Sequence, residues 1–160
     1  MDARRLEGEW LDELPADDPR ARRSRADLRR INALMGNARI VAAAVKPMFR
    51  EPPRSLVELG AGDGVFVLRL AQLIGARGMD LTLVDQQRIV APETLRALGE
   101  AGATVDVAQA DVFDWLERPG PRVDVIMANL FLHHFEDGPL ARMLSLIASR
   151  RRPRHGCVVR

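Results

Sequence analysis

Short apolar runs alternate with helical patterns along most of the chain. The apolar runs have the length of buried strands, whereas the segments between them repeat their apolar residues every three or four positions, as amphipathic helices do. Strands are predicted over residues 55–61, 80–85, 104–111, 122–132 and 156–160, and helices over 64–78, 92–102 and 137–150. The predicted apolar faces are Val65, Leu68, Ala71 and Ile74 in one helix and Leu140, Leu144 and Ile147 in another. This alternation predicts βαβ units and a mostly parallel sheet with helices on both faces.

The first fifty residues have a different pattern. Asp18 and Pro19 favour a helix start, and a long helical repeat follows until Pro47 and the pair at 52–53. Its apolar positions are Leu28, Ile31, Met35, Ala38, Ala42 and Val45. We therefore divide the chain into an N-terminal helical cap over residues 1–50 and an α/β core over 54–160.

Composition places the chain among globular proteins. It has 160 residues, of which 47% are hydrophobic and 29% charged, the size and balance of one domain. No apolar window reaches the roughly 18 residues of a membrane span, and the N-terminus is too polar for a secretory signal. A single cysteine, Cys157, excludes an intramolecular disulfide. The expectation is a cytoplasmic protein with no membrane partner.

Charge adds little to this interpretation. The formal net charge is +2, with arginine-rich runs at residues 20–30 and 150–154. Such runs can contact phosphate. Acidic neighbours surround the first, and no aromatic residues are interleaved with either, so we interpret both as solvated faces and expect no nucleic-acid partner.

The strongest chemical signal is a glycine-rich turn between a predicted strand and a predicted helix. Gly60, Gly62 and Gly64 follow Glu58, and glycines at such a turn let a ligand approach the backbone. Val65 stands where the dinucleotide-binding fingerprint has its third glycine, which weakens a nicotinamide interpretation. Glu58 places negative charge beside the turn, which suits a ligand that carries positive charge.

Polar residues end the next three strands. Asp85 closes the second, Asp111 the third, and Asn129 follows the apolar part of the fourth. The carboxyl ends of parallel strands meet at one sheet edge, where such folds bind ligands. A carboxylate at the position of Asp85 can accept both hydroxyls of a ribose.

Together these segments resemble the class I S-adenosylmethionine-dependent methyltransferases. Residues 58–64 (ELGAGDG) are similar to the first motif of that family, and residues 124–135 (DVIMANLFLHHF) to the fourth. The resemblance implies a Rossmann-like fold, S-adenosylmethionine as cofactor and in-line methyl transfer. It implies that Asp85 holds the ribose and that Asp111 and Val112 frame the adenine. The implied cofactor-binding residues are Glu58, Gly60, Ala61, Gly62, Gly64, Asp85, Gln86, Asp111, Val112 and Asn129.

The chain departs from the family at its end. The family core has seven strands, whereas this sequence reaches Arg160 within or just after the fifth. We therefore expect a C-terminally truncated core. Two alternatives stay open. One is a catalytically inactive cofactor-binding remnant. The other is a nicotinamide-dependent oxidoreductase, which is disfavoured by Val65 in place of the third glycine of the fingerprint and by the presence of Asp111.

No residue is assigned as catalytic from the pattern. His133 and His134 are candidates for a base, but neighbours on a strand point to opposite faces, so a shared metal ion is not expected. Trp10, Trp115, Phe131 and Phe135 are interpreted as packing residues. Residues 129–132 read NLFL, not the (D/N)-P-P-(Y/F) motif of the amino-methylating type, and no added domain for reading macromolecules is visible. We expect a small-molecule acceptor, and the sequence leaves the oligomeric state open.

Overall fold

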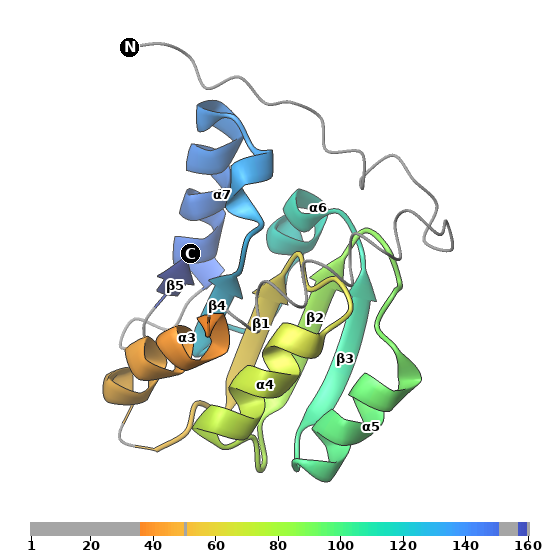
Figure 1. Ribbon diagram of the computed structural model, residues 1–160. Helices are drawn as coiled ribbons and strands as arrows, with labels where there is room; N and C mark the ends of the chain where they lie inside the picture. The colour runs from red at the N-terminus through yellow and green to blue at the C-terminus, as the bar shows by residue number, and fades with distance from the viewer. Residues whose placement is uncertain (1–35, 50, 151–156, 160) are drawn as a thin grey trace.

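The computed structural model describes residues 36–49, 51–150 and 157–159. Its centre is a five-stranded sheet in the order β3-β2-β1-β4-β5, in which every pair of neighbours is parallel (Figure 1). The strands are β1 (Ser55–Leu59), β2 (Asp80–Asp85), β3 (Thr104–Gln109), β4 (Val125–Ala128) and β5 (Cys157–Val159). The predicted doubly wound, Rossmann-like α/β fold is confirmed.

The two faces of the sheet bury separate cores. One core contains Leu56, Leu81 and Leu83 beneath α3 (Asn37–Val45), α4 (Val65–Ile74) and α5 (Pro92–Glu100). The other contains Val57, Leu59 and Val84 beneath α6 (Val112–Glu117) and α7 (Asp137–Arg150). Because successive strand residues point to opposite faces, both faces of the central strands must be apolar. This explains why these strands are continuous apolar runs.

The predicted helix faces are partly wrong. In α4 the buried residues are Val67, Leu70, Ala71 and Ile74, so the helix is rotated from the face that includes Val65 and Leu68. In α7 Met143 and Ile147 are buried, whereas Leu144 is 41% exposed. Nearly every position of α4 is apolar, so its periodicity fits more than one face and tertiary packing decides between them.

The fourth strand is shorter than predicted. It ends at Ala128, and the next residues form a loop and the 3-10 turn η2 (Leu132–His134). Helix α6 was not predicted, although Asp111 followed three residues later by Asp114 resembles a capping signal. Another 3-10 turn, η1 (Lys46–Met48), follows α3 and contains Pro47, where the helix was predicted to end.

The predicted N-terminal cap lies mostly outside the described residues. Its described part, α3, buries Val41, Ala42 and Val45 in the same core as α4. This stretch therefore packs as part of the α/β layers, and the position of residues 1–35 relative to the cleft stays a prediction. Among the described residues, no helix has the length and apolar content needed to cross a membrane.

Candidate functional site

A cleft of about 390 Å³ opens at the carboxyl edge of the sheet. It lies where β1 has β2 on one side and β4 on the other, the topological switch point at which open α/β sheets bind ligands. Its described lining consists of Gly60, Gly62, Val84, Asp85, Gln86, Gln87, Ile89, Ala110, Val112, Leu130, Phe131, His134 and Phe135. The volume falls within the range of small-molecule sites.

Three glycines shape the turn after β1. Gly60, Gly62 and Gly64 all have positive φ, at 69°, 56° and 73°, a region that side chains disfavour. The amides of Gly60 and Ala61 both donate to the carbonyl of Val84, at 2.9 and 3.1 Å. The turn is thereby joined to the end of β2. Gly60 and Gly62 line the cleft, while Ala61 and Gly64 lie buried behind it.

Asp85 lies on the cleft wall in a fixed orientation. Its Oδ2 accepts the Gly62 amide at 2.8 Å, and its Oδ1 accepts the Gln87 amide, also at 2.8 Å. Each carboxylate oxygen has capacity for a second hydrogen bond. The structure therefore brings Asp85 to the glycine turn, with acceptor capacity left on a half-buried side chain.

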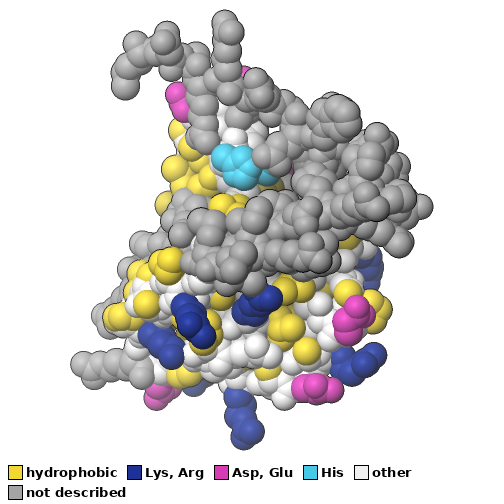
Figure 2. Space-filling view, viewed as in Figure 1, with side chains coloured by type: hydrophobic (Ala, Val, Ile, Leu, Met, Phe, Trp, Pro, Cys, Tyr) yellow, Lys and Arg dark blue, Asp and Glu magenta, His cyan; other side chains and the backbone are white. Residues whose placement is uncertain are grey.

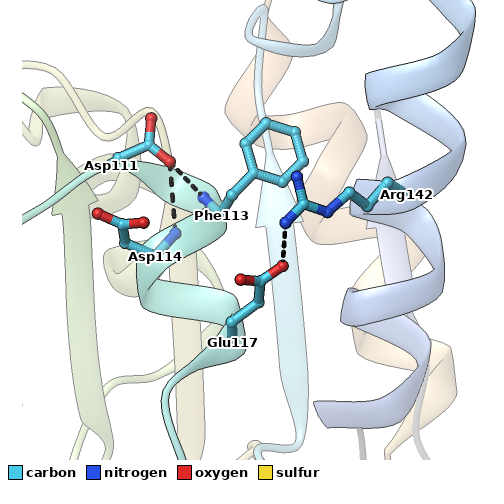
Figure 3. Close-up of polar contacts among 5 residues, drawn as sticks. All are labelled: Asp111, Phe113, Asp114, Glu117 and Arg142. Atoms are coloured by element: carbon cyan, nitrogen blue, oxygen red, sulfur yellow. Dashed lines mark hydrogen bonds and ion pairs between the residues drawn. The ribbon is translucent and has the colours of Figure 1, made fainter.

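Asp111 caps a helix and lies next to the cleft lining. Its Oδ1 accepts the amides of Phe113 and Asp114 at the start of α6 (Figure 3), and its Oδ2 accepts Gln86 Nε2 at 2.9 Å. Gln86 and Val112 line the cleft, whereas Asp111 is absent from its described lining. The helix is further tied to α7 through an ion pair between Glu117 and Arg142, whose guanidinium lies over the Phe113 ring.

Glu58 lies inside the core. It is 2% exposed, its register neighbours on β2 and β4 are Leu83 and Met127, and its Oε2 has no hydrogen-bond partner among the described residues. Burial raises the pKa of this carboxyl well above its ordinary value, and repulsion from Asp63 and Asp85 raises it further. The sequence placed Glu58 beside the turn, but it is absent from the described lining of the cleft.

The loop after β4 forms the opposite wall. Asn129 is half-buried behind the lining, and its Oδ1 has no partner among the described residues. Leu130 has φ of 52°, the one positive φ of a non-glycine residue in the described chain. Phe131 then turns its ring onto the glycine turn: a Cβ built on Gly60 would lie 2.2 Å from Phe131 Cδ2. Gly60 is therefore required both by its φ and by this ring.

The histidine prediction needs correction. His133 and His134 lie on η2 and not on a strand, so the expected opposite orientation is wrong: their rings are 4.1 Å apart. Figure 2 shows the described histidine side chains together at the surface beside hydrophobic ones. His134 lines the cleft, whereas His133 is exposed outside it. Among the described residues, no three His, Cys, Asp or Glu side chains are grouped so that they could hold a metal ion.

Sequence reasoning missed part of the cleft wall. Phe131 and Phe135 were assigned to packing, and they do contact the core beneath α6 and α7, but they also line the cleft. Val84, Gln87, Ile89, Ala110 and Leu130 were not singled out either. Their signal was position alone, because each lies within a few residues of a strand end at the carboxyl edge.

Comparison with known protein families identifies a methyltransferase domain. A family profile described as a methyltransferase domain matches residues 56–154, which is more than half of the chain. The match begins in β1 and includes the glycine turn, Asp85, Asp111 and the loop after β4. A comparison with curated proteins gave no significant match.

Several solved structures named as methyltransferases have a similar fold. An O-methyltransferase family protein from Burkholderia thailandensis is 21% identical with a TM-score of 0.68, over 90% of this chain and 42% of its own. The mitomycin 7-O-methyltransferase MmcR is 22% identical with a TM-score of 0.60, over 95% and 42%. The plantazolicin methyltransferase BpumL, in complex with SAH, is 17% identical with a TM-score of 0.60, over 85% and 51%. These identities show the fold, and the chain spans about half the length of these proteins or less.

Proposed function

The chain belongs to the class I S-adenosylmethionine-dependent methyltransferases, and on this premise we propose that its cleft binds S-adenosylmethionine and that the protein methylates a small-molecule acceptor. The observation that carries the proposal is the contact between Asp85 and the glycine turn. A carboxylate fixed by the Gly62 amide at 2.8 Å lies on the wall of a cleft at the switch point of the sheet.

The cleft residues suit the parts of this cofactor. Asp85 has oxygens to accept both ribose hydroxyls while the Gly62 and Gln87 amides hold it in place. Ile89 and Val112 offer apolar contact for a flat base. Gly60 and Gly62 present backbone without side chains, where the amino-acid arm can approach closely. No lysine or arginine is in the described lining, which suits a positively charged ligand.

The remaining cofactor assignments rest on the family resemblance. The described lining does not include Glu58, Ala61, Gly64, Asp111 or Asn129, and Gln86 joins Asp111 to the cleft by a hydrogen bond of 2.9 Å. We propose that Asp111 contacts the adenine amino group through the side of its carboxylate that faces Gln86. His133 and His134 stay candidates for a base, with His134 the better placed because it lines the cleft.

Methyl transfer requires mainly that the protein align the reactants. S-adenosylmethionine supplies a methyl group that is already activated by the positive charge on sulfur. The protein has to orient the acceptor in line with the carbon–sulfur bond and keep water away. The aromatic wall formed by Phe131, His134 and Phe135 offers a surface that excludes water beside the glycine turn. A base is needed only when the acceptor arrives protonated.

We propose a small-molecule acceptor because the wall after β4 is apolar and aromatic. The similar structures named for mitomycin and plantazolicin agree with this class. That no nucleic acid is a partner stays a prediction. The cap over residues 1–50 and the cytoplasmic location stay predictions.

Calorimetric titration of the purified chain with S-adenosylhomocysteine (SAH) tests the proposal. We expect one-site binding, with NAD⁺ and ATP as control ligands that produce no comparable heat. Binding of NAD⁺ in place of SAH would favour the oxidoreductase alternative. Absence of SAH binding in a chain that is folded by circular dichroism overturns the proposal. SAH binding without methyl transfer to any of a panel of small phenols and amines favours the binding-only alternative.

A further inference from the structure

The ring of Phe131 is held in one orientation beside the glycine turn. Gly60 lies directly against it, since a Cβ there would be 2.2 Å from Phe131 Cδ2. Phe135 packs against it edge to face, with ring centroids 5.1 Å apart and planes at 72°. His134 lies 6.0 Å away on the same turn. The ring is thus fixed by its neighbours while it lines the cleft.

A sulfonium is difficult for a protein to recognise by hydrogen bonds. Its sulfur carries positive charge and three carbon substituents, with no N–H or O–H to donate. Carboxylates, carbonyl oxygens and the negative faces of aromatic rings attract such a cation. The positive charge can therefore strengthen binding only where such a group lies near the sulfur.

The carboxylates of this region are poorly placed for that role. Asp85 is the one carboxylate in the described lining, and under the proposed function its remaining acceptor positions hold the two ribose hydroxyls. Glu58 is buried behind the turn and absent from the lining. Phe131, by contrast, lines the cleft and lies against Gly60, the turn residue that we propose the amino-acid arm approaches.

We propose that Phe131 strengthens binding of the sulfonium of S-adenosylmethionine relative to the thioether of SAH through a cation–π contact. The inference rests on the proposed function and adds to it a residue that contacts the positively charged sulfur. In methyl transfer the acceptor lone pair forms the new bond to carbon, and the carbon–sulfur electron pair stays on sulfur. The sulfur then becomes neutral, so the contact with the ring weakens after transfer and favours product release.

Titrations with both ligands test this contact without a known acceptor. We would measure dissociation constants of S-adenosylmethionine and SAH for the wild type, Phe131→Leu and Phe113→Leu. Leucine keeps apolar contact but removes the aromatic face. In Phe131→Leu, S-adenosylmethionine should bind about 5- to 30-fold more weakly, the range of a cation–π contact. SAH should lose less than about 3-fold, because only apolar contact changes for it.

Phe113→Leu is the matched control. Phe113 belongs to the same group of aromatic rings but is absent from the described lining of the cleft and packs on Phe135 and Arg142, so its loss should leave the ratio of the two dissociation constants unchanged. Phe131→Trp is the second variant: it keeps a stronger aromatic face and should preserve or raise the preference for the cation.

The outcomes separate the inference from the proposed function. A wild type that binds neither ligand overturns both. A wild type that binds both, with a ratio that Phe131→Leu leaves unchanged, overturns only the role of Phe131. Should Phe131→Leu fail to fold by circular dichroism, the decision passes to Phe131→Trp, where a fall in the preference for S-adenosylmethionine contradicts the inference.

Discussion

The two ends of the sheet use an aspartate in similar ways for different results. At the amino edge, Asp124 Oδ2 accepts the amides of Arg54 and Ser55 at 2.9 and 3.1 Å, and its own amide donates to Ser55 Oγ. At the carboxyl edge, Asp85 accepts the amides of Gly62 and Gln87. Asp124 is 4% exposed and joins β1 to β4, whereas Asp85 is half-buried and lies on a cleft.

The difference teaches that a hydrogen-bond pattern alone does not identify a binding residue. Both carboxylates satisfy backbone amides of a neighbouring segment. What separates them is the local backbone: at the amino edge Asp124 and Ser55 contact each other, while at the carboxyl edge three glycines adopt positive φ. The end of the sheet whose turn only glycine adopts without strain is the one we propose to bind the cofactor.

The largest expected effects come from removing each aspartate. Asp124→Ala should lower the free energy of unfolding by about 3 kcal/mol, because two amides lose a charged acceptor. Urea denaturation measures this, and SAH affinity under native conditions should not change. Asp85→Ala should do the reverse, with SAH binding about 100-fold weaker and a smaller loss of stability. A large loss of SAH affinity in Asp124→Ala, or no loss in Asp85→Ala, would contradict the assignment of Asp124 to stability and Asp85 to binding.

A second test compares two glycines of the turn. Gly60→Ala and Gly62→Ala share the strain of a positive φ, at 69° and 56°. Only at Gly60 does a Cβ collide with Phe131; at Gly62 nothing lies within 4 Å. Gly60→Ala should therefore cost about 2 kcal/mol more in thermal or urea unfolding, the cost of overpacking. Equal costs would mean that the Phe131 ring moves away freely, which would also weaken its proposed role.

A smaller effect should separate the two roles of Asp111. Asp111→Ala should lower the free energy of unfolding by about 1 kcal/mol through loss of the α6 cap, while Asp111→Asn keeps the cap and changes stability by only a few tenths. Both variants should bind SAH about 5-fold more weakly if the carboxylate contacts adenine. Unchanged affinity in Asp111→Asn would assign the residue to helix capping alone.

Glu58→Gln should change the free energy of unfolding least of these variants at mildly acidic pH. Burial raises the pKa of Glu58, so the folded chain keeps a proton that the unfolded chain has lost. The contribution of protonated Glu58 to stability should therefore be complete below the ordinary value of 4.5 and should be lost as pH rises through the raised pKa. The Glu58→Gln variant should have the stability of the wild type at low pH, and its free energy of unfolding should depend less on pH. Urea unfolding at a series of pH values measures this dependence. An equal dependence in both proteins would contradict the prediction.

Much of the fold could be predicted because its signals are local. β2 was predicted with the bounds observed, and Pro92 and Gly102 marked the ends of the segment that holds α5. The helix rotation of α4, the early end of β4 and the turn that holds His133 and His134 could not be predicted. In each case the local sequence fits two conformations, and contacts with distant segments select one.

For the candidate site, the sequence by itself determined the chemical types and their order along the chain. Glycine spacing and carboxylates at strand ends are properties of neighbouring residues, so Gly60, Gly62 and Asp85 could be identified without a structure. Only the tertiary structure decided which side chains share the cleft. In the structure Glu58 is buried, Asp111 is absent from the described lining of the cleft, and Phe131 lies against Gly60. The reason is that parallel strands bring distant loops to one edge, where packing, and not sequence spacing, decides which groups meet.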